Sequence, residues 1–446
     1  MIPARRPLLL IVLLLFSFWT RGQDTLITKS GNKTGLNLGA LPSVLFNSDL
    51  GFQYGALANL YQYGDGSLYP DYRWSLYGEL ARTTKGGGIN QLNFDSKYLM
   101  PFGIRVTADL SYLTQQALDF YGFNGYQSRY NVSWETEDEE DYISRMFYRI
   151  ERRLLRMEAA FQKPLGGSPW NVLAGYTFLN LEIGEVDIDA LNKGKAADDV
   201  LPDTVSLYKL YMNWGLLPEV DQTGGRVSMF KAGVVYDTRD NEPNPMNGIW
   251  AEAVVATAPS FLMDRSGWTK LALIYRQYFS LKRNVFSLAC RFGYQGTILG
   301  SAPWYMQSYM INSMTRSTTV DGLGGGRSLR GILRNRVVGD AVGYANLEFR
   351  WKVVRTYWLK QNFYIALSSF LDTGKVLKSI GVDRSKVPEE VTTQFFDTGD
   401  DNWHSSIGGG LHIAMNENFV FAVDYGRALD KRDGLSGVYI GLNWLF

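Results

Sequence analysis

Three charged residues in the second half of the chain could form an ion-pair site. Arg330 lies in the glycine-rich stretch Asp321–Gly331, and the carboxylates Glu348 and Asp372 lie in the two stretches that follow it. An arginine guanidinium is always charged and can bind carboxylates through parallel hydrogen bonds. These residue types therefore indicate a cationic loop tip that folds back into a polar cavity. On the residues alone, the alternative is a solvated loop arginine and two solvated carboxylates.

The stretches that carry the two carboxylates alternate polar and apolar residues with period two, which is typical of strands. Their polar phases hold Tyr344, Asn346, Glu348 and Arg350 in the first stretch, and Ser368, Phe370 and Asp372 in the second. Gly324–Gly326 allow the preceding loop to bend sharply or to adopt positive φ. We therefore expect this loop to deliver Arg330 to the polar faces of two neighbouring strands.

Signals for catalysis are weak. The stretch GLGGGR lacks the GK[ST] sequence of a phosphate-binding loop and a third glycine at dinucleotide spacing. A hydrolase would need a serine such as Ser405 or Ser406 beside His412, which we expect instead to be a polar residue of the cavity lining. The single cysteine, Cys290, excludes an internal disulfide framework and a four-cysteine zinc site. No catalytic, cofactor-binding or metal site is predicted, and the protein is not expected to be an enzyme.

The composition favours strands that meet a membrane. Aromatic residues make up 14% of the 446 residues and glycines number 46, which suits aromatic-girdled strands joined by tight turns. Lys and Arg number 45 against 44 Asp and Glu, so no bulk charge indicates a nucleic-acid partner.

The first 22 residues are typical of a secretory signal peptide. Arg5 and Arg6 precede the apolar run Leu8–Trp19, and small residues at Thr20 and Gly22 predict cleavage before Gln23. The run is shorter than the ~20 residues that a spanning helix needs. Residues 23–35 are expected to be a short periplasmic segment, too short for a folded domain, and residues 36–446 to be the main domain.

Period-two alternation recurs through that domain. In 103–113, apolar residues such as Val106 and Leu110 alternate with polar ones such as Asp109. A soluble sandwich would alternate too, but aromatic residues crowd the ends of the apolar phases, and short turns interleave with long polar loops. These features predict an all-β, transmembrane antiparallel β-barrel of about 16 strands with long extracellular loops and short periplasmic turns.

Two segments are harder to assign. Residues 142–163 have helix-forming composition, yet they alternate cleanly, and we assign them to a strand. The spacing of Leu207, Leu210, Tyr211 and Trp214 predicts a short helix within an outer loop. The acidic run 135–141 is interpreted as a solvated loop, or alternatively as a contact for cations or lipopolysaccharide.

The last residues of the chain form an aromatic-ended strand pattern. Tyr439, Gly441 and Asn443 are assigned to the inner phase, and the lipid-facing phase comprises Val438, Ile440, Leu442, Trp444 and Phe446. The pattern is similar to the C-terminal signal by which outer-membrane barrels are recognised for insertion. Its expected key residues are Tyr439, Gly441, Trp444 and Phe446.

Three internal motifs carry a family resemblance. They are VYDTRDNEPNPMNG at Val235–Gly248, SLRGI at Ser328–Ile332 and SFLDTG at Ser369–Gly374. With the C-terminal pattern, they resemble the BamA/TamA-type outer-membrane assembly family, also called the bacterial surface antigen family. The resemblance covers roughly residues 36–446, and the segment Phe120–Gly122 also looks like a recurrent piece of the family.

The resemblance implies a site. In that family, a loop arginine followed by glycine folds into the lumen and pairs with acidic residues on the next two strands. The matching residues here are Arg330, Gly331, Glu348 and Asp372. BamA and TamA proteins also carry periplasmic (POTRA) modules before the barrel, and this sequence is expected to be a barrel-only member without them.

The expected role is to assist insertion or translocation of proteins at the outer membrane of a Gram-negative bacterium. The alternative is a narrow pore or a structural barrel without assembly activity. Expected partners are outer-membrane lipid and lipopolysaccharide, and other outer-membrane proteins or a separate periplasmic-domain protein. No cofactor is expected.

Overall fold

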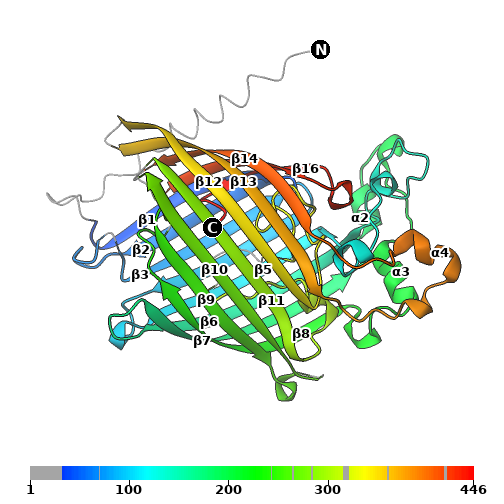
Figure 1. The fold of residues 1–446 in the computed structure, drawn as a ribbon, viewed down its shortest axis with the longest axis horizontal. Helices are drawn as coiled ribbons and strands as arrows, with labels where there is room; N and C mark the ends of the chain where they lie inside the picture. The colour runs from blue at the N-terminus through cyan, green and yellow to red at the C-terminus, as the bar shows by residue number, and fades with distance from the viewer. Residues whose placement is uncertain are drawn as a thin grey trace, which may run out of the picture.

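Sixteen antiparallel strands form one closed barrel (Figure 1). This holds for the residues that the computed structural model describes, which are 33–446 except 70, 243, 264–265, 283–284, 315–320, 359–360 and 416–418. The predicted all-β barrel and its strand number are confirmed. The predicted signal peptide, 1–22, and nearly all of the segment 23–35 lie outside the described residues.

Each strand pairs with its neighbours in sequence, and β16 closes the barrel against β1. The bounds are β1 Leu36–Asn47, β2 Gly51–Gln62, β3 Trp74–Thr83, β4 Gly87–Ser96, β5 Arg105–Asp119, β6 Arg149–Pro164, β7 Trp170–Gly184, β8 Gly224–Asp237, β9 Gly248–Ala258, β10 Trp268–Lys282, β11 Phe286–Gly300, β12 Ala341–Trp358, β13 Gln361–Lys378, β14 His404–Met415, β15 Phe419–Ala428 and β16 Ser436–Leu442.

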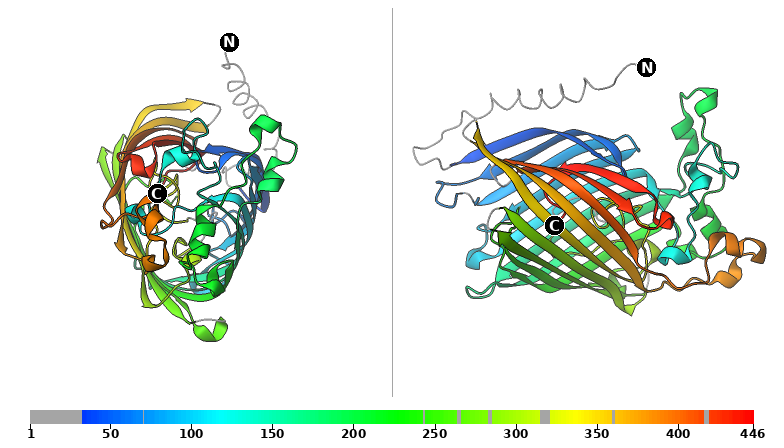
Figure 2. Two further views of the ribbon diagram at one scale, coloured as in Figure 1. Left: turned by 90° about the vertical axis from the view of Figure 1, so that its right-hand side faces the viewer. Right: turned by 45° about the horizontal axis from the view of Figure 1, so that its top comes forward.

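The helices lie in the connections between strands. The α-helices are α2 Ile188–Asn192, α3 Leu207–Asn213 and α4 Glu389–Phe395, and all three belong to long loops at one end of the barrel (Figure 2). The 3-10 turns are η2 Pro101–Gly103, η3 Gly125–Gln127, η4 Val132–Glu135, η5 Ala197–Asp199, η6 Glu219–Asp221, η7 Ser260–Leu262, η8 Trp304–Met306, η9 Arg384–Lys386 and η10 Lys431–Asp433. The predicted loop helix is confirmed as α3, whose first turn is capped by the Ser206 hydroxyl. No described helix is long and apolar enough to cross a membrane.

Burial alternates along the strands as the sequence predicts. On β13, Ile365, Leu367 and Leu371 are exposed on the outer surface, while Phe370 and Asp372 are buried inside. An outward apolar face and an inward polar face are what a membrane-spanning barrel requires. The inner faces then place charged residues in the lumen.

The assignment of 142–163 to a strand is confirmed only in its second part, because β6 begins at Arg149. Arg156 is held by the Asp109 carboxylate of β5, with 2.7 Å between Nε and Oδ1. Such tertiary contacts outweigh the helix-forming composition, since intrinsic propensity is a weak preference. The preceding residues are irregular, and Phe147 and Tyr148 pack into the outer loops.

The prediction that Trp444 and Phe446 face lipid is wrong. β16 ends at Leu442, Asn443 has a positive φ of 67°, and both aromatic side chains are buried inside the barrel. The Trp444 ring stacks on His412 with centroids 3.7 Å apart, and its Nε1 donates to Asn244 at 3.0 Å. The bend gives the indole N–H an acceptor that hydrocarbon would not provide. Tyr439 lies on the inner face as predicted, whereas Asn443, predicted to face inward, is exposed.

Candidate functional site

The loop between β11 and β12 folds back into the barrel lumen. Residues 321–338 of this loop, the plug loop, have their own small apolar core against the barrel wall. That core consists of Leu323, Leu329, Ile332 and Val337 with Val342, Tyr344, Val376 and Ala428. Burial of these side chains stabilises the inserted position, because apolar surface leaves water when the loop enters the lumen. The loop is therefore packed against the inner wall of the barrel.

Glycines set the path of the plug loop at two positions. Gly324 and Gly331 have positive φ values of 117° and 90°, which L side chains rarely adopt. A Cβ added at Gly331 would lie only 2.5 Å from the carbonyl carbon of Gly426 on β15. The residue after Arg330 must therefore be glycine for the plug loop to approach the wall this closely.

Arg330 contacts both predicted carboxylates. Its side chain is completely buried, with Nη1 2.7 Å from Glu348 Oε2 and Nε 3.0 Å from Asp372 Oδ2. Nη2 and the backbone N–H also donate to Asp372, at 3.2 and 3.0 Å. Burial opposes the charge of Arg330, but Asp372 and Glu348 outweigh it and raise the pKa of the guanidinium. The structure thus places Arg330, Gly331, Glu348 and Asp372 together.

Two partners of Arg330 were missed from the sequence. Asp424 on β15 accepts from Nη1 at 3.3 Å, and the guanidinium carbon lies 3.4 Å from the ring centre of Phe370. Phe370 was placed on an inner phase from the sequence, and Asp424 also lies on the inner face of its strand. The order of strands around the barrel, and so the closeness of β15 to the plug loop, was the missing information.

A second arginine extends the site toward the end of the chain. Arg350 donates to Glu348 Oε1 at 2.7 Å and to the backbone oxygen of Phe446 at 2.8 Å. The site therefore holds two guanidinium groups and three carboxylates. His412 is buried beside it, 3.5 Å from Asp424, and hydrogen-bonds to neither Ser405 nor Ser406. That arrangement suits a polar lining residue.

The plug loop also binds the two strands where the barrel closes. The Gly326 N–H donates to Asp49, just after β1, at 2.9 Å, and the Gly331 N–H donates to the Tyr439 hydroxyl on β16 at 3.0 Å. A Cβ added at Gly326 would meet the Tyr439 ring at 2.4 Å. The plug loop therefore touches the strands on both sides of the closure.

The opposite wall holds the two ends of the plug loop. Arg152 on β6 binds Asp321 through two hydrogen bonds of 2.7 and 2.8 Å, and Arg334 Nε donates to Asp119 on β5 at 2.9 Å. Charge-assisted, two-pronged contacts of this kind fix orientation as well as position.

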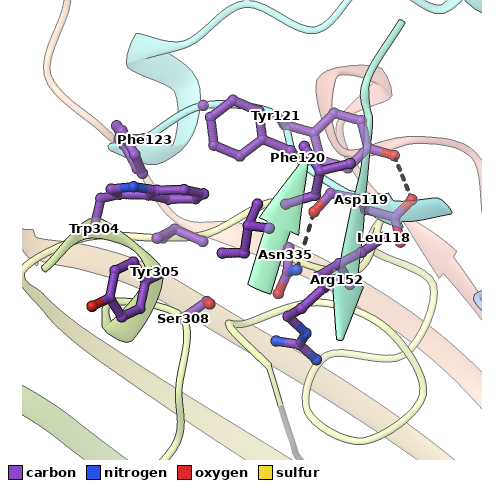
Figure 3. A pocket seen from close by; sticks show the side chains of 14 residues that line it. Leu118, Asp119, Phe120, Tyr121, Phe123, Arg152, Trp304, Tyr305, Ser308 and Asn335 are labelled. Atoms are coloured by element: carbon purple, nitrogen blue, oxygen red, sulfur yellow. Dashed lines mark hydrogen bonds between the residues drawn. The ribbon is translucent and has the colours of Figure 1, made fainter. Parts of the chain in front are cut away.

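The segment Phe120–Gly122 caps the plug loop from the outer side. Figure 3 shows Phe120 facing Trp304, and Asn335 of the plug loop donating to the Asp119 backbone oxygen at 3.1 Å. The residues enclose a cavity of about 30 Å³, too small for an organic ligand. The cap is therefore a packing element.

The junction between β1 and β16, here called the seam, is short. Two register pairs join these strands, Phe46 with Ile440 and Asn47 with Tyr439, and the Ser48 N–H donates to the Val438 oxygen at 2.9 Å. All residues of β1 pair with β2 on its other side. Within the described chain, Leu36–Leu45 have no strand partner on the seam side.

Among the described residues, no group of three or more His, Cys, Asp or Glu is placed to hold a metal ion. The site, here called the lock, holds opposite charges together and joins a loop to the barrel wall through ion pairs.

Comparisons with known proteins agree with the barrel fold. A family model described as "Omp85 superfamily domain" matches residues 78–444. BamA from Haemophilus ducreyi lacking POTRA domains 1–3 is similar over 92% of this chain and 71% of that chain, with a TM-score of 0.55 and 14% identity. CdiB from Escherichia coli is similar over 92% of this chain and 62% of that chain, with a TM-score of 0.48 and 11% identity. No curated protein matches the sequence.

Proposed function

The chain belongs to the Omp85 superfamily, and on that premise we propose that its barrel assists insertion or translocation of proteins at the outer membrane. The family resemblance inferred from the sequence motifs is confirmed. A barrel of this family implies an outer-membrane location. The activity proposed here rests on the seam.

The unpaired edge of β1 is the observation that carries the proposal. Peptide groups that face hydrocarbon without partners are costly, which is why membrane barrels normally close along their whole length. An exposed edge is also a template on which another strand can pair. Along Leu36–Leu45, β1 offers such an edge to a strand of a client protein.

The plug loop is placed to control the opening of the seam. It binds Asp49 beside β1 and Tyr439 on β16, and it is itself fixed to the wall by Arg330. Release of the plug loop would remove both contacts at the seam in one step. The lock would therefore hold the barrel closed when no client is present.

A disulfide across the seam tests the proposal. Phe46 and Ile440 are directly opposite each other in register, and residues so paired have Cα separations that suit a disulfide. The variant is Phe46→Cys with Ile440→Cys in a Cys290→Ala background. The matched control places the same pair across a complete ladder, as Ile365→Cys with Ile413→Cys.

The assay uses protein in liposomes and measures how fast a urea-unfolded eight-stranded outer-membrane barrel acquires heat-resistant migration. The oxidised seam variant should lose its acceleration of this folding and regain it on reduction, while the control should match the parent in both states. Equal acceleration by the oxidised and reduced seam variant would overturn the proposal.

The alternative function, a narrow pore, is opposed by the plug loop and by the inward fold of Trp444 and Phe446. A pore would show steady conductance in planar bilayers that the seam disulfide does not change. That result, together with no acceleration of folding, would favour the alternative.

A further inference from the structure

A second, separate cavity lies among the outer loops. It has a volume of about 490 Å³, within the range of ~300–1,000 Å³ that is typical of ligand pockets. Four connections meet around it, those between β5 and β6, β11 and β12, β13 and β14, and β15 and β16. Its lining residues are Tyr126, Arg129, Tyr130, Asn131, Trp134, Asp141, Arg336, Gln394, Asp397 and Arg432.

Arg336 is a buried guanidinium in the wall of this cavity. It is 2% exposed, and three of its N–H groups donate to the backbone oxygens of Arg432, Gly125 and Ser128 at 2.9, 2.8 and 3.1 Å. A guanidinium has five N–H groups, so two are left without an acceptor within the described structure. Its nearest carboxylate oxygen, on Asp433, is 3.8 Å away. The wall of the cavity therefore holds a fixed positive charge with two N–H donors that no described acceptor occupies.

The other two arginines are half-exposed and held by contacts that a ligand can replace. Arg129 lies 3.9 Å from Asp397, and its side chain is 50% exposed. Arg432 pairs with Asp430, with a side chain that is 52% exposed, and its guanidinium carbon lies 3.8 Å from the ring centre of Tyr126. Exposed ion pairs contribute little stability. An anion in the cavity would therefore compete well for both arginines.

The remaining lining is rigid and suited to a polyhydroxylated ligand. The Tyr126 ring stacks on His404 with centroids 3.9 Å apart, and its hydroxyl donates to Asp433 at 2.6 Å. Trp134 is buried beneath the lining, and the half-buried Tyr130 offers an aromatic surface on which the C–H face of a sugar packs. The side-chain amides of Asn131 and Gln394 and the two carboxylates offer donors and acceptors for hydroxyl groups.

We propose that this cavity, the outer-loop pocket, binds an acidic sugar of a surface glycan, with the acid group at the three arginines and the ring on the aromatic side chains. The lining carries three guanidinium groups, whose N–H donors can bind an acid group. The pocket is built at the end of the barrel that carries the long loops, which is the outer side. This inference does not depend on the proposed assembly function: the pocket shares Arg336 with the plug loop but no residue with the seam.

Saturation-transfer NMR tests whether the ligand must carry a negative charge. Detergent-purified protein is titrated with D-glucuronate and, separately, with D-glucose. Glucuronate should bind roughly tenfold or more tightly than glucose, because charge-assisted hydrogen bonds are about twice as strong as neutral ones. Equal affinities for the two sugars would overturn the proposal.

Charge-removing variants test the place of binding. Arg129→Gln and Arg432→Gln should each weaken glucuronate binding by about fivefold or more, whereas Asp397→Asn should strengthen it by about twofold, because a competing anion is removed. Arg153→Gln is the matched control, since Arg153 is an arginine of similar exposure, 53%, paired with Glu151 on β6. An equal loss in the control, or weaker binding in Asp397→Asn, would place the binding elsewhere and refute the pocket.

Competition then distinguishes two sources of the sugar. Alginate, a soluble polyuronate, should displace glucuronate if the natural ligand is a free polysaccharide. Lipopolysaccharide with acidic core sugars, incorporated in nanodiscs with the protein, should displace it if the ligand is anchored in the membrane. Failure of both glycans to displace bound glucuronate would contradict a glycan ligand.

Discussion

The seam and the junction between β12 and β13 are built on different principles. β12 and β13 pair along almost their whole length, from Ala341 with Lys378 to Trp358 with Gln361. β1 and β16 share two register pairs and depend on Asp49 and Tyr439, which the plug loop binds. β12 and β13 are joined by a long backbone ladder, whereas the seam has only two register pairs and one further backbone hydrogen bond, with the plug loop bound on both of its sides. Closure of this barrel is therefore divided between a fully paired part and a sparsely paired part.

Buried charges follow the same division. Arg156 on β6 pairs with Asp109 on β5, so this ion pair joins two strands that are already joined by backbone. Arg330, by contrast, joins a loop to β12, β13 and β15. Loss of the first pair should weaken the barrel without opening it, and loss of the second should open the seam.

Arg330→Ala should have the largest effect. It leaves Asp372 buried without its cation and Glu348 with Arg350 alone, and removal of one partner of a buried pair costs about 3–5 kcal/mol. The barrel should lose heat-resistant migration on gels at a lower temperature, and the seam strands should exchange amide hydrogens faster. Arg156→Ala is the control that should lower stability comparably without faster exchange confined to the seam. Unchanged migration of Arg330→Ala would contradict the lock.

Gly331→Ala should come next. The new methyl group would meet the backbone of Gly426, and the positive φ of 90° adds strain of about 1–3 kcal/mol. We expect a lower midpoint of unfolding in urea and partial release of the plug loop. Gly441→Ala is the matched control, because nothing lies within 4 Å of a Cβ added there. If the two variants have the same urea midpoint of unfolding, the close approach of Gly331 to the wall does not contribute to stability.

Tyr439→Phe and Asp49→Asn should have smaller effects. Each weakens one hydrogen bond between the plug loop and the seam, which contributes about 0.5–1.5 kcal/mol. The change should appear as faster hydrogen exchange in β1 and β16, with little change in global stability. Tyr275→Phe, which removes a hydroxyl that bonds Gln277 on β10, should leave the seam unchanged. If hydrogen exchange in β1 and β16 rises equally in Tyr275→Phe, Tyr439 and Asp49 have no specific role at the seam.

The smallest effect is expected in the outer loops at low pH. Asp401 accepts from the backbone N–H groups of Tyr126 and Val376, both at 2.9 Å. Burial opposes its charge, but the hydrogen bond with His404 and the neighbouring donors prevail, and the pKa of Asp401 is lowered from 3.8. Its contribution is therefore complete above pH 3.8 and is lost as the pH falls through the lowered value.

The test compares melting temperatures at about pH 5 and about pH 3 in the parent and in Asp401→Asn, with tryptophan fluorescence as the probe. The parent should lose more stability between these two values than the variant, because the variant has no carboxyl at this position to protonate. An equal loss in both proteins would show that Asp401 does not contribute.

The sequence predicted the barrel well because lipid-facing and lumen-facing residues must alternate wherever a strand crosses a membrane. Glu348 and Asp372 were found on the inner phases by that rule, and Arg330 by its glycine-rich loop and the family resemblance. The partner Asp424 was on the correct phase but could not be assigned, since phase gives the face of a strand and not its distance from a loop.

The end of the chain shows the limit of the same rule. Trp444 and Phe446 continue the period-two pattern of β16, so the sequence predicts that they face lipid. The bend at Asn443 depends on the acceptor of Asn244, the ring of His412 and the guanidinium of Arg350, which are remote in sequence. Periodicity carries no information about such contacts.

Hydrogen exchange of the whole barrel tests the central claim that the plug loop, through Arg330, holds the seam. The comparison is between the parent, Arg330→Ala and Arg156→Ala in detergent or nanodiscs. In Arg330→Ala, exchange should accelerate in Leu36–Asn47 and Ser436–Leu442 while β10 to β12 keep their protection. Exchange that rises evenly around the barrel, or a protected seam in Arg330→Ala, would contradict the account.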